Sequence, residues 1–412
     1  MERRVVVTGI GAVTPIGNNV EDFWKGIKNN QVGIAPITKF DTTDFKVKLN
    51  AEIKDFNAAD FMDAKSAKRM DDFSKYAMVA SMEAMKNSGL EITEENADRI
   101  GCIIGSGVGG SITHEDMVLR MNEKGPKRVS PLFVPMYIVN MAAGNICIHF
   151  GIHGKSLSVS TACASGTNAV GEAFRAIKYG EADAVLTGGT EASMAPCGVA
   201  GFVSLNALNF TDDPEKASIP FDLERNGFII GEGAGMLVLE ELEHAKKRNA
   251  DILAEVVGYG STTDAFHITL PREDGSGAAK AMVLAMKEAD VKPEDISYIN
   301  AHGTSTHAND LTETKAIKLA FGDYAAKVPI SSTKSMIGHL LGAAGAVELI
   351  TCVKSIQESY IHPTVGLKTP DPECDLDYVP GEGRNIEVNY AISNSLGFGG
   401  HNASVIIKKY VE

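Results

Sequence analysis

Residues 160–167 read Ser-Thr-Ala-Cys-Ala-Ser-Gly-Thr and connect an apolar β-rich run to a helical stretch expected over residues 170–180. Residues 332–335 read Ser-Thr-Lys-Ser and also precede a helical stretch, expected over residues 340–360. Self-similarity at a fixed spacing is the signature of a repeated supersecondary unit. The two segments therefore suggest that one α/β unit occurs twice in the chain.

Two further similarities support this duplication. Residues 231–239 (GEGAGMLVL) resemble residues 399–407 (GGHNASVII), and residues 256–260 (VVGYG) resemble residues 6–11 (VVTGIG) at the opening of the chain. Chance similarity between glycine-rich strand ends is the alternative explanation. A boundary near residues 250–253 fits all three pairs.

Short β-rich runs alternate with helical patterns throughout the chain, which indicates an α/β fold with largely buried sheets. We expect two fused halves, residues 1–251 with the cysteine of the opening segment and residues 252–412. The β-rich runs lie at residues 5–8, 100–104, 184–186, 236–239, 254–257, 296–299, 386–392 and 405–407.

Composition excludes several classes of protein. The 412 residues are 44% hydrophobic, enough for a globular two-lobed interior, and no run of 18 apolar residues predicts a membrane span. The net charge of −14 argues against non-specific nucleic-acid binding, so an acidic partner needs a local basic patch. The six cysteines form no CxxC pair and the chain opens without a signal-peptide pattern, so we expect a reducing cytoplasm.

Cys163 is the leading candidate for chemistry. A thiol on a sharp strand-to-helix turn meets the unpaired N–H groups of the helix, which favour the thiolate and lower its pKa into roughly the 3.5–7.5 range. The small residues after it leave space for a substrate carbonyl. The alternative is an inert buried cysteine, which is common for free cysteines.

Two histidines and an ion pair are further candidates. His302 follows a predicted strand in Asn-Ala-His-Gly-Thr-Ser-Thr, and His339 lies in a glycine-rich segment. A neutral imidazole facing a cleft can donate to a developing oxyanion, although a satisfied buried histidine is the simpler interpretation of either residue alone. Glu348 lies in an apolar helical stretch and would need a buried cation, for which Lys334 is the obvious candidate.

Cofactor motifs are weak or absent in the sequence. Residues 9–14 begin like a dinucleotide fingerprint but lack its third glycine and the later acidic residue. There is no G-K-[ST] phosphate loop, no H-E-x-x-H motif and no cysteine pairing suited to zinc. The sequence therefore predicts neither a nucleotide cofactor nor a catalytic metal.

Four linked motifs, together with two supporting segments, make the chain resemble the β-ketoacyl-acyl carrier protein synthases, and their synthase II branch most closely. The resemblance covers essentially the whole chain and implies the thiolase fold, with duplicated halves in a five-layered α-β-α-β-α arrangement. The motifs are the Cys163 segment and residues 300–306, 334–339 and 394–402; the supporting segments are residues 188–192 and 220–222.

The resemblance implies an acyltransferase of type II fatty acid synthesis that performs a decarboxylative Claisen condensation. A cysteine takes an acyl group from acyl carrier protein; malonyl-carrier protein then loses CO2, and its carbanion attacks the acyl-enzyme to give 3-oxoacyl-carrier protein. No cofactor is implied, because the substrates travel on the phosphopantetheine arm of the carrier protein.

Roles follow residue by residue from the resemblance. Cys163 is implied as the nucleophile, and its backbone N–H and that of Phe398 as the oxyanion hole. His302 and His339 are implied to stabilise the enolate oxygen. Lys334, paired with Glu348, is implied to organise the electrostatics of the site.

Further positions are implied around the pocket. Thr304 and Thr306 match threonines that hydrogen-bond pantetheine, and Val108 matches a branched residue that limits the acyl tunnel. Phe398 matches a gating phenylalanine whose loop, including Gly399, needs glycines to swing. One departure is His307, where the family pattern has proline, and it bears on the shape of the pantetheine entrance.

The family also implies partners and a bound ion. Lys65 and Arg69 resemble positions that dock the acidic carrier protein, although solvated helix charges are an equal alternative. Homodimers form through the strand before the nucleophile, here about residues 155–160, which would bury an exposed sheet edge. The family pattern also allows a structural monovalent cation near Asn300, Glu348 and Ser393.

Neighbouring activities on the same fold differ at identifiable positions. A thiolase needs a second cysteine in the C-terminal glycine-rich loop, where this chain has Phe398 and His401, and a Cys-His-Asn synthase would replace His339 by asparagine. A non-catalytic chain-length partner would lack Cys163. A polyketide-type ketosynthase and a malonyl-carrier-protein decarboxylase stay open as alternatives.

Overall fold

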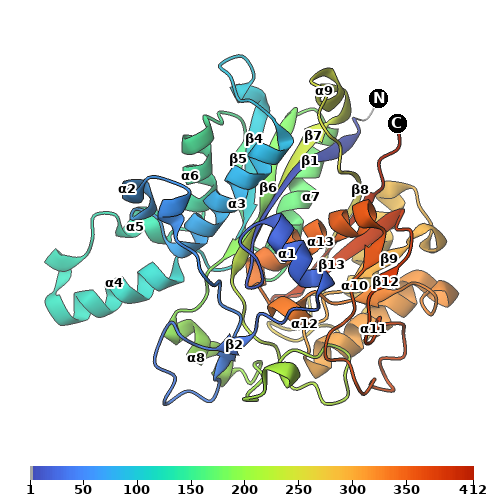
Figure 1. Cartoon of the computed structure of the whole chain (residues 1–412). Helices are drawn as coiled ribbons and strands as arrows, with labels where there is room; N and C mark the ends of the chain where they lie inside the picture. Colours follow the sequence, from blue (N-terminus) through green and yellow to red (C-terminus); the bar gives the residue numbers. More distant parts are fainter. Residues whose placement is uncertain (1–2) are drawn as a thin grey trace.

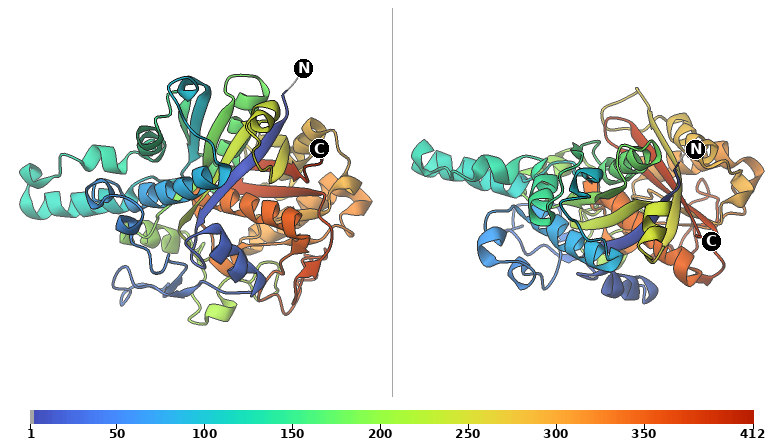
Figure 2. Two further views of the ribbon diagram at one scale, coloured as in Figure 1. Left: turned by 45° about the horizontal axis from the view of Figure 1, so that its top comes forward. Right: turned by 90° about the horizontal axis from the view of Figure 1, so that it is seen from above.

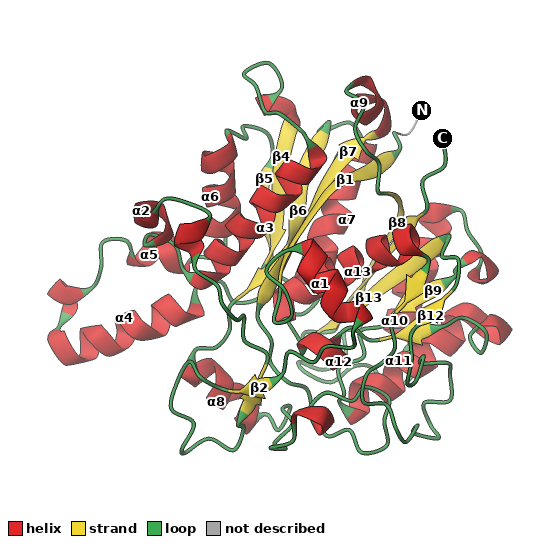
Figure 3. Ribbon diagram, viewed as in Figure 1, coloured by secondary structure: helices red, strands yellow, loops and turns green. Residues whose placement is uncertain are grey.

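A ten-stranded mixed sheet forms the frame of the computed structural model, which describes residues 3–412 (Figures 1 and 3). The strand order is β10-β9-β13-β14-β8-β1-β7-β6-β4-β5. The ten strands are β1 (Val5–Val13), β4 (Ile100–Gly105), β5 (Ser156–Val159), β6 (Ala184–Glu191), β7 (Gly233–Glu241), β8 (Ala254–Thr263), β9 (Tyr298–Asn300), β10 (Ile330–Ser331), β13 (Tyr390–Gly397) and β14 (His401–Lys408). Two small ribbons pair β2 (Ala35–Pro36) with β3 (Leu49–Asn50) and β11 (Tyr360–Ile361) with β12 (Arg384–Asn385).

The order of the strands repeats. In the first half β1 is antiparallel to β7 and β7 to β6, whereas β6, β4 and β5 are parallel; β8, β14, β13, β9 and β10 have the same directions in the second half. The halves join where β1 pairs antiparallel with β8, from Val5 opposite Val256 to Val7 opposite Ala254. Segments that resemble each other in sequence lie on equivalent strands, β7 with β14 and β1 with β8.

Helices complete a layered arrangement around these strands (Figure 2). The two central helices α7 and α13 share one core with strands of both halves, as Val170, Val347, Leu237 and Val405 show. Helix α3 covers the outer face of the first half, and α10 and α11 cover the outer face of the second. The helices are α1 (Val20–Lys28), α2 (Ala64–Ala67), α3 (Asp72–Ser88), α4 (Ser111–Lys124), α5 (Phe133–Tyr137), α6 (Met141–Phe150), α7 (Ser165–Lys178), α8 (Pro196–Ser204), α9 (Leu242–Lys247), α10 (Ser276–Ala289), α11 (His307–Phe321), α12 (Lys334–Ile337) and α13 (Ala344–Glu358).

The bounds of several elements differ from the sequence expectations. Helix α7 begins at Ser165, earlier than expected. Gly166 in its first turn lies close to the carbonyl of Gly342, and a Cβ there would lie 2.9 Å from that oxygen. Helix α13 begins at Ala344, later than expected, because Leu341 has a φ of 47° and residues 341–343 form a separate 3-10 turn. The run at residues 386–392 becomes strand only from Tyr390 onward.

Helix α4 extends away from the body of the molecule (Figure 2). None of its residues is buried, and its exposed side chains include the apolar Val118, Leu119 and Met121. Strand β5 forms one edge of the large sheet, with Leu157 exposed. Within residues 3–412, no helix is long and apolar enough to span a membrane.

Candidate active site

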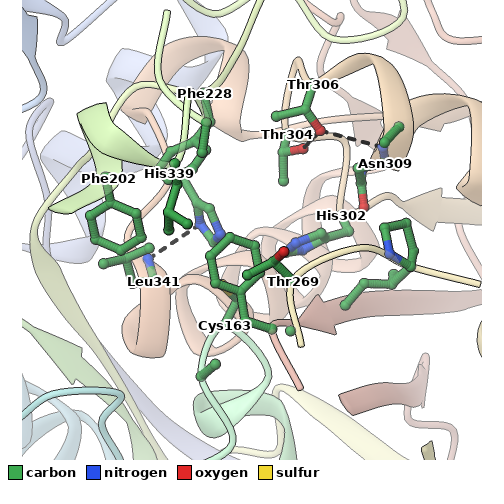
Figure 4. Close-up of a pocket in the computed structure, with 18 of the residues that line it drawn as sticks. Cys163, Phe202, Phe228, Thr269, His302, Thr304, Thr306, Asn309, His339 and Leu341 are labelled. Carbon is green, nitrogen blue, oxygen red and sulfur yellow. Dashed lines mark hydrogen bonds between the residues drawn. The ribbon is translucent and has the colours of Figure 1, made fainter. Parts of the chain in front are cut away.

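A pocket of about 480 Å3 lies where the two halves meet, with Cys163, His302 and His339 in its wall (Figure 4). Cys163 comes from the turn after β5, and His302 from the loop after β9. His339 comes from the segment after α12. Further lining residues include Val108, Glu191, Phe202, Phe228, Thr269, Leu270, Thr304, Thr306, His307 and Phe398.

The thiol and the two imidazoles form a close cluster. One sulfur and one ring nitrogen from each histidine all lie within 4.8 Å of one another. The two rings are nearly perpendicular, with centroids 5.1 Å apart and an interplanar angle of 84°. All three side chains are buried in the wall of the pocket, so a single small group in the cavity can contact all of them.

Strained backbone and two N–H groups hold Cys163. The preceding Ala162 has a φ of 50°, in the left-handed region that costs a residue with a Cβ about 1 kcal/mol. The backbone N–H groups of Phe398 and of Cys163 itself act to lower the pKa of the thiol and so favour its ionised form. The turn therefore aims the sulfur at two donors that could receive a developing oxyanion.

The pKa of Cys163 contradicts the expectation from the helix N-terminus. Burial raises the pKa of the thiol to about 11, although the charge of Lys334 and the N–H of Phe398 act in the opposite direction. The buried carboxyl of Glu191 raises it further. The expectation of a pKa between 3.5 and 7.5 was wrong because the sequence does not reveal how completely the sulfur is removed from water.

Both histidines are held neutral. Burial, followed by the charge of Lys334, keeps the pKa of His302 and of His339 well below the usual value. The backbone N–H of Leu341 donates to Nδ1 of His339 at 3.2 Å, so the ring proton of His339 is on Nε2 (Figure 4). The loop of His302 is fixed by Glu313, which accepts the N–H groups of His302 and Gly303 at 2.8 Å each.

Lys334 and Glu348 form a buried ion pair beside this cluster. Lys334 Nζ lies 2.5 Å from Glu348 Oε1, and both side chains are about 1% exposed. Burial raises the pKa of Glu348, and the charge of Lys334 opposes that rise. The second carboxylate oxygen, Oε2, has no hydrogen-bond partner among residues 3–412.

Two other buried side-chain oxygens also have no hydrogen-bond partner within the described residues. Ser393 on β13 is in register with Asn300 on β9, and within the described chain Ser393 Oγ and Asn300 Oδ1 have no hydrogen-bond partner. Carboxylate, amide and hydroxyl oxygens are ligands suited to hard cations. The three residues that the family pattern associates with a cation thus each carry an unpaired buried oxygen.

Several of the remaining predicted residues line the pocket. Thr304 and Thr306 line the pocket with their hydroxyl oxygens 3.0 Å apart, and His307, the first residue of α11, lines it beside them. Val108 lines the pocket and is about half exposed. Phe398 lines it too, with its ring centroid 6.4 Å from that of Phe202.

Besides the buried residues Lys334, Glu348, Asn300 and Ser393, three further predicted residues are not part of the pocket wall. Gly399, with a φ of 86°, follows Phe398 outside the lining, and its N–H donates to the carbonyl of Ile268 at 2.8 Å. Lys65 in α2 and Arg69 just after it are exposed on the surface, away from the lining residues.

Glu191 was missed by sequence reasoning. Its buried carboxylate accepts hydrogen bonds from Ser106 Oγ and from the backbone N–H groups of Gly107, Val108 and Gly342. These donors come from both halves of the chain. An acidic residue at the end of the apolar run in residues 184–192 was the only signal available.

A second omission is the contact between two loops at the mouth. Asp264 Oδ1 accepts a hydrogen bond from Asn402 Nδ2 at 2.7 Å, and Asp264 Oδ2 accepts the N–H of Arg272 at 3.0 Å. The N–H of Asp264 donates to the carbonyl of Gly400 at 2.9 Å. These bonds join the loop that carries Phe398 to the loop that carries Thr269.

Cys163, His302 and His339 together also have the composition of a soft-metal site. No metal-ligand spacing such as H-E-x-x-H marks this cluster, because its members come from three distant segments. The neutral state of both imidazoles suits either metal binding or hydrogen-bond donation.

Comparison with known proteins defines the class. The model of the N-terminal domain of β-ketoacyl synthases matches residues 2–245, and that of the C-terminal domain matches residues 253–368. The chain belongs to the β-ketoacyl synthase family.

Two relatives show which members of the family the chain is similar to. The chain is 52% identical over 410 residues to the 3-oxoacyl-[acyl-carrier-protein] synthase 2 of Synechocystis sp., covering 99% of each chain. It is also 52% identical over 408 residues to the protein of the same name from Staphylococcus aureus, again covering 99% of each chain.

Solved structures agree with this assignment. A type II polyketide ketosynthase in complex with its acyl-carrier protein matches with a TM-score of 0.93 at 34% identity over all of both chains. A β-ketoacyl synthase from Burkholderia phymatum matches with a TM-score of 0.92 at 35% identity, covering 99% of this chain and 100% of that one. The predicted thiolase-like fold is confirmed.

Proposed function

We propose that the chain is a condensing acyltransferase of type II fatty acid synthesis, which joins an acyl group held on Cys163 to malonyl-acyl carrier protein and releases CO2. The observation that carries this proposal is the cluster of one thiol and two neutral imidazoles within 4.8 Å in the wall of a pocket. The 52% identity to 3-oxoacyl-[acyl-carrier-protein] synthase 2 proteins supports the choice of substrate class.

Acylation uses the sulfur and the two backbone donors. The Cys163 sulfur attacks the thioester carbonyl of acyl carrier protein, and the N–H groups of Cys163 and Phe398 stabilise the tetrahedral oxyanion. Collapse expels the pantetheine sulfur, which leaves as a thiol with the proton that Cys163 gives up. The charge of Lys334 favours the transient thiolate.

Condensation uses the neutral imidazoles. The malonyl thioester oxygen accepts a hydrogen bond from Nε2–H of His339 and one from His302, so loss of CO2 leaves an enolate with its charge stabilised. The enolate carbon attacks the acyl carbonyl on Cys163. Expulsion of the Cys163 sulfur as a thiolate then releases 3-oxoacyl-carrier protein. The thiolate takes up a proton from solvent, which restores the free enzyme.

The pocket supplies binding contacts. We assign Thr304 and Thr306 to the pantetheine arm, because their hydroxyls lie together on the wall that leads to His302. Val108 limits the acyl tunnel, and Phe398 gates it, with Gly399 supplying the freedom to swing. His307 shapes the entrance beside Thr306.

A monovalent cation fits the three unpaired oxygens. Asn300, Glu348 and Ser393 would hold it. Lys334 contacts only one oxygen of the Glu348 carboxylate, and the positive charge of the ion would stabilise the other. The ion would be structural, and no catalytic metal or organic cofactor takes part in the proposed reaction.

Partners are part of the same proposal. Carrier protein as a partner is supported by the complex of a neighbouring ketosynthase with its carrier protein. We assign the docking of this acidic partner to the exposed Lys65 and Arg69. A homodimer forms through the open edge of β5, where the exposed apolar residues of α4 supply further area to bury. We place this dimer in the cytoplasm, and its two halves divide between residues 251 and 252.

Two alternative activities share the site. The type II polyketide ketosynthase matches at 34% identity, below the 52% of the 3-oxoacyl-[acyl-carrier-protein] synthase 2 relatives, which favours fatty acid elongation. A malonyl-carrier-protein decarboxylase would use the same histidines without an acyl group on Cys163.

Intact-mass spectrometry tests the proposal. The protein is mixed with acyl carrier proteins of several acyl lengths, and malonyl-carrier protein is then added. We expect an acyl adduct that is lost in Cys163→Ala, persists in the matched exposed-cysteine control Cys197→Ala, and is converted to one 3-oxoacyl product. Decarboxylation without any adduct would favour the decarboxylase, and multiple unreduced extensions would favour the polyketide enzyme.

A further inference from the structure

A chain of buried hydrogen bonds begins at His362, which the proposed reaction does not use. His362 is fully buried just after β11, and its ring lies beside residues of β9 and β10. Its Nε2 faces three hydroxyl groups, those of Thr333 at 3.1 Å and of Tyr298 and Ser331 at 3.3 Å each.

The direction of the first bond in this chain is fixed by chemistry. Nδ1 of His362 lies 2.8 Å from the carbonyl oxygen of Pro363, and a carbonyl can only accept, so Nδ1 carries the ring proton. Burial lowers the pKa of His362 to about 4, so the ring is neutral near pH 7. Nε2 is therefore an acceptor, and we assign its donor as Thr333, whose hydroxyl is the nearest of the three.

The same logic fixes the next residue. With its only proton directed at His362, Thr333 Oγ1 accepts, and Asn300 Nδ2 donates to it at 2.9 Å. The second Nδ2 proton of Asn300 goes to the Tyr298 hydroxyl at 3.0 Å. Because both amide protons are used on this side, Oδ1 points the other way, and it has no partner within residues 3–412.

We propose that His362 is a positioning residue that orients the side-chain amide of Asn300, so that Asn300 presents its oxygen to the cation held with Glu348 and Ser393. The inference rests on the proposed cation. If the amide turned over, its NH2 group would replace the oxygen and would repel the cation. A neutral imidazole thus selects one of two amide orientations through a single intervening hydroxyl.

Cation-dependent thermal stability of the full chain tests this role. Melting temperatures are measured in increasing KCl or NaCl, with choline chloride holding the ionic strength constant, because a ligand that binds the folded state raises the melting temperature. The variants are His362→Leu, which removes the acceptor, and His362→Gln, which can retain an acceptor near the Nε2 position. Ser355→Ala is the matched control, since Ser355 is a buried hydroxyl on α13 outside this chain of bonds.

We expect wild type, His362→Gln and Ser355→Ala to show similar saturable stabilisation by K+ or Na+. His362→Leu should need roughly 10–100-fold more cation for half the effect, the usual loss on removing an indirect partner of a ligand. If His362→Leu does not fold, Thr333→Val interrupts the same chain and should show the same loss.

The outcomes separate the two proposals. Unchanged cation dependence in His362→Leu, or in Thr333→Val where the leucine variant does not fold, with a normal wild-type response, overturns the positioning role and leaves the cation in place. Absence of any cation-specific response in wild type overturns the cation and, with it, this role, while the adduct on Cys163 remains an independent test of condensation.

Discussion

The backbone N–H of Leu341 donates to Nδ1 of His339, and this bond leaves the ring proton on Nε2 of a histidine that is clustered with Cys163 and His302. Leu341 reaches this position with a φ of 47°, outside the conformation that a leucine prefers. The left-handed backbone of Leu341 thus accompanies the hydrogen bond that determines which nitrogen of His339 carries the proton.

Replacement of His339 by alanine should therefore affect carbanion formation most. Removal of an oxyanion donor costs about 10²–10³ in rate, so malonyl-carrier-protein decarboxylation should fall by that factor, whereas acylation of Cys163 should fall less than about tenfold. Decarboxylation is measured as released CO2 and acylation by intact mass. A larger loss in acylation would show that the role of His339 is misassigned.

Acylation of Cys163 should accelerate with pH. Because burial raises the pKa of this thiol to about 11, the thiolate fraction rises about tenfold per unit between pH 7 and 9. The measurement is the rate of adduct formation under single-turnover conditions. Lys334→Met should be slower at each pH since it removes the cation that favours thiolate; a wild-type plateau near pH 7 would contradict the prediction.

The Lys334–Glu348 pair should behave as a unit. Lys334→Met leaves a buried carboxylate without its partner and should cost about 3–5 kcal/mol of unfolding free energy. Lys334→Met combined with Glu348→Leu should recover most of that loss. Urea unfolding of the two single variants and the double variant measures the coupling, and additive losses would show that the ion pair is not energetically linked.

Glu313 should make stability depend on pH. Burial raises the pKa of Glu313 to about 7 from 4.5, so between these values the folded state holds a proton that the unfolded state has lost. Its contribution to the unfolding free energy is complete below pH 4.5 and declines as pH rises to 7. Glu313→Gln should remove this decline, so its denaturation midpoints should change less over that range than those of wild type. Parallel curves would refute the assignment.

The bonds of Asp264 should control access to the acyl-enzyme. Asp264→Ala releases the loops that carry Phe398 and Thr269, so condensation should slow by roughly 10–100-fold as the substrate loses its fixed position. Loss of the acyl adduct to water should become faster, which intact mass follows over time. Asp274→Ala, an exposed change in the same segment, is the control and should leave both rates unchanged.

The sequence predicts most strands of the large sheet, because buried strands can be recognised as short apolar runs. Every β-rich run overlaps a strand of the large sheet, and the faint repeat corresponds to equivalent strands. Helix starts are less predictable: α13 begins after the left-handed Leu341, and the first turn of α7 contains Gly166, which closely approaches the carbonyl of Gly342. Such features depend on contacts between the halves rather than on local propensity.

Some residues of the candidate site can also be predicted from the sequence, and others cannot. Cys163 carries a local signal, and the histidines are recognised through the linked motifs, but the direction of the cysteine pKa shift depends on how deeply the sulfur is buried. Glu191 and Asp264 act through backbone N–H groups of distant loops, which no residue pattern displays.

The pairing of β1 with β8 should allow the two repeats to be encoded in the opposite order. The start of β1 and the end of β14 both pair with the start of β8, so they lie on the same side of the molecule (Figure 1). The thiol comes from one repeat, while both imidazoles come from the other. A circular permutant that opens between the repeats and links the old ends would reverse their order in translation. It would keep every neighbour of the reacting atoms, so the chemistry belongs to the pairing of the repeats and not to their order.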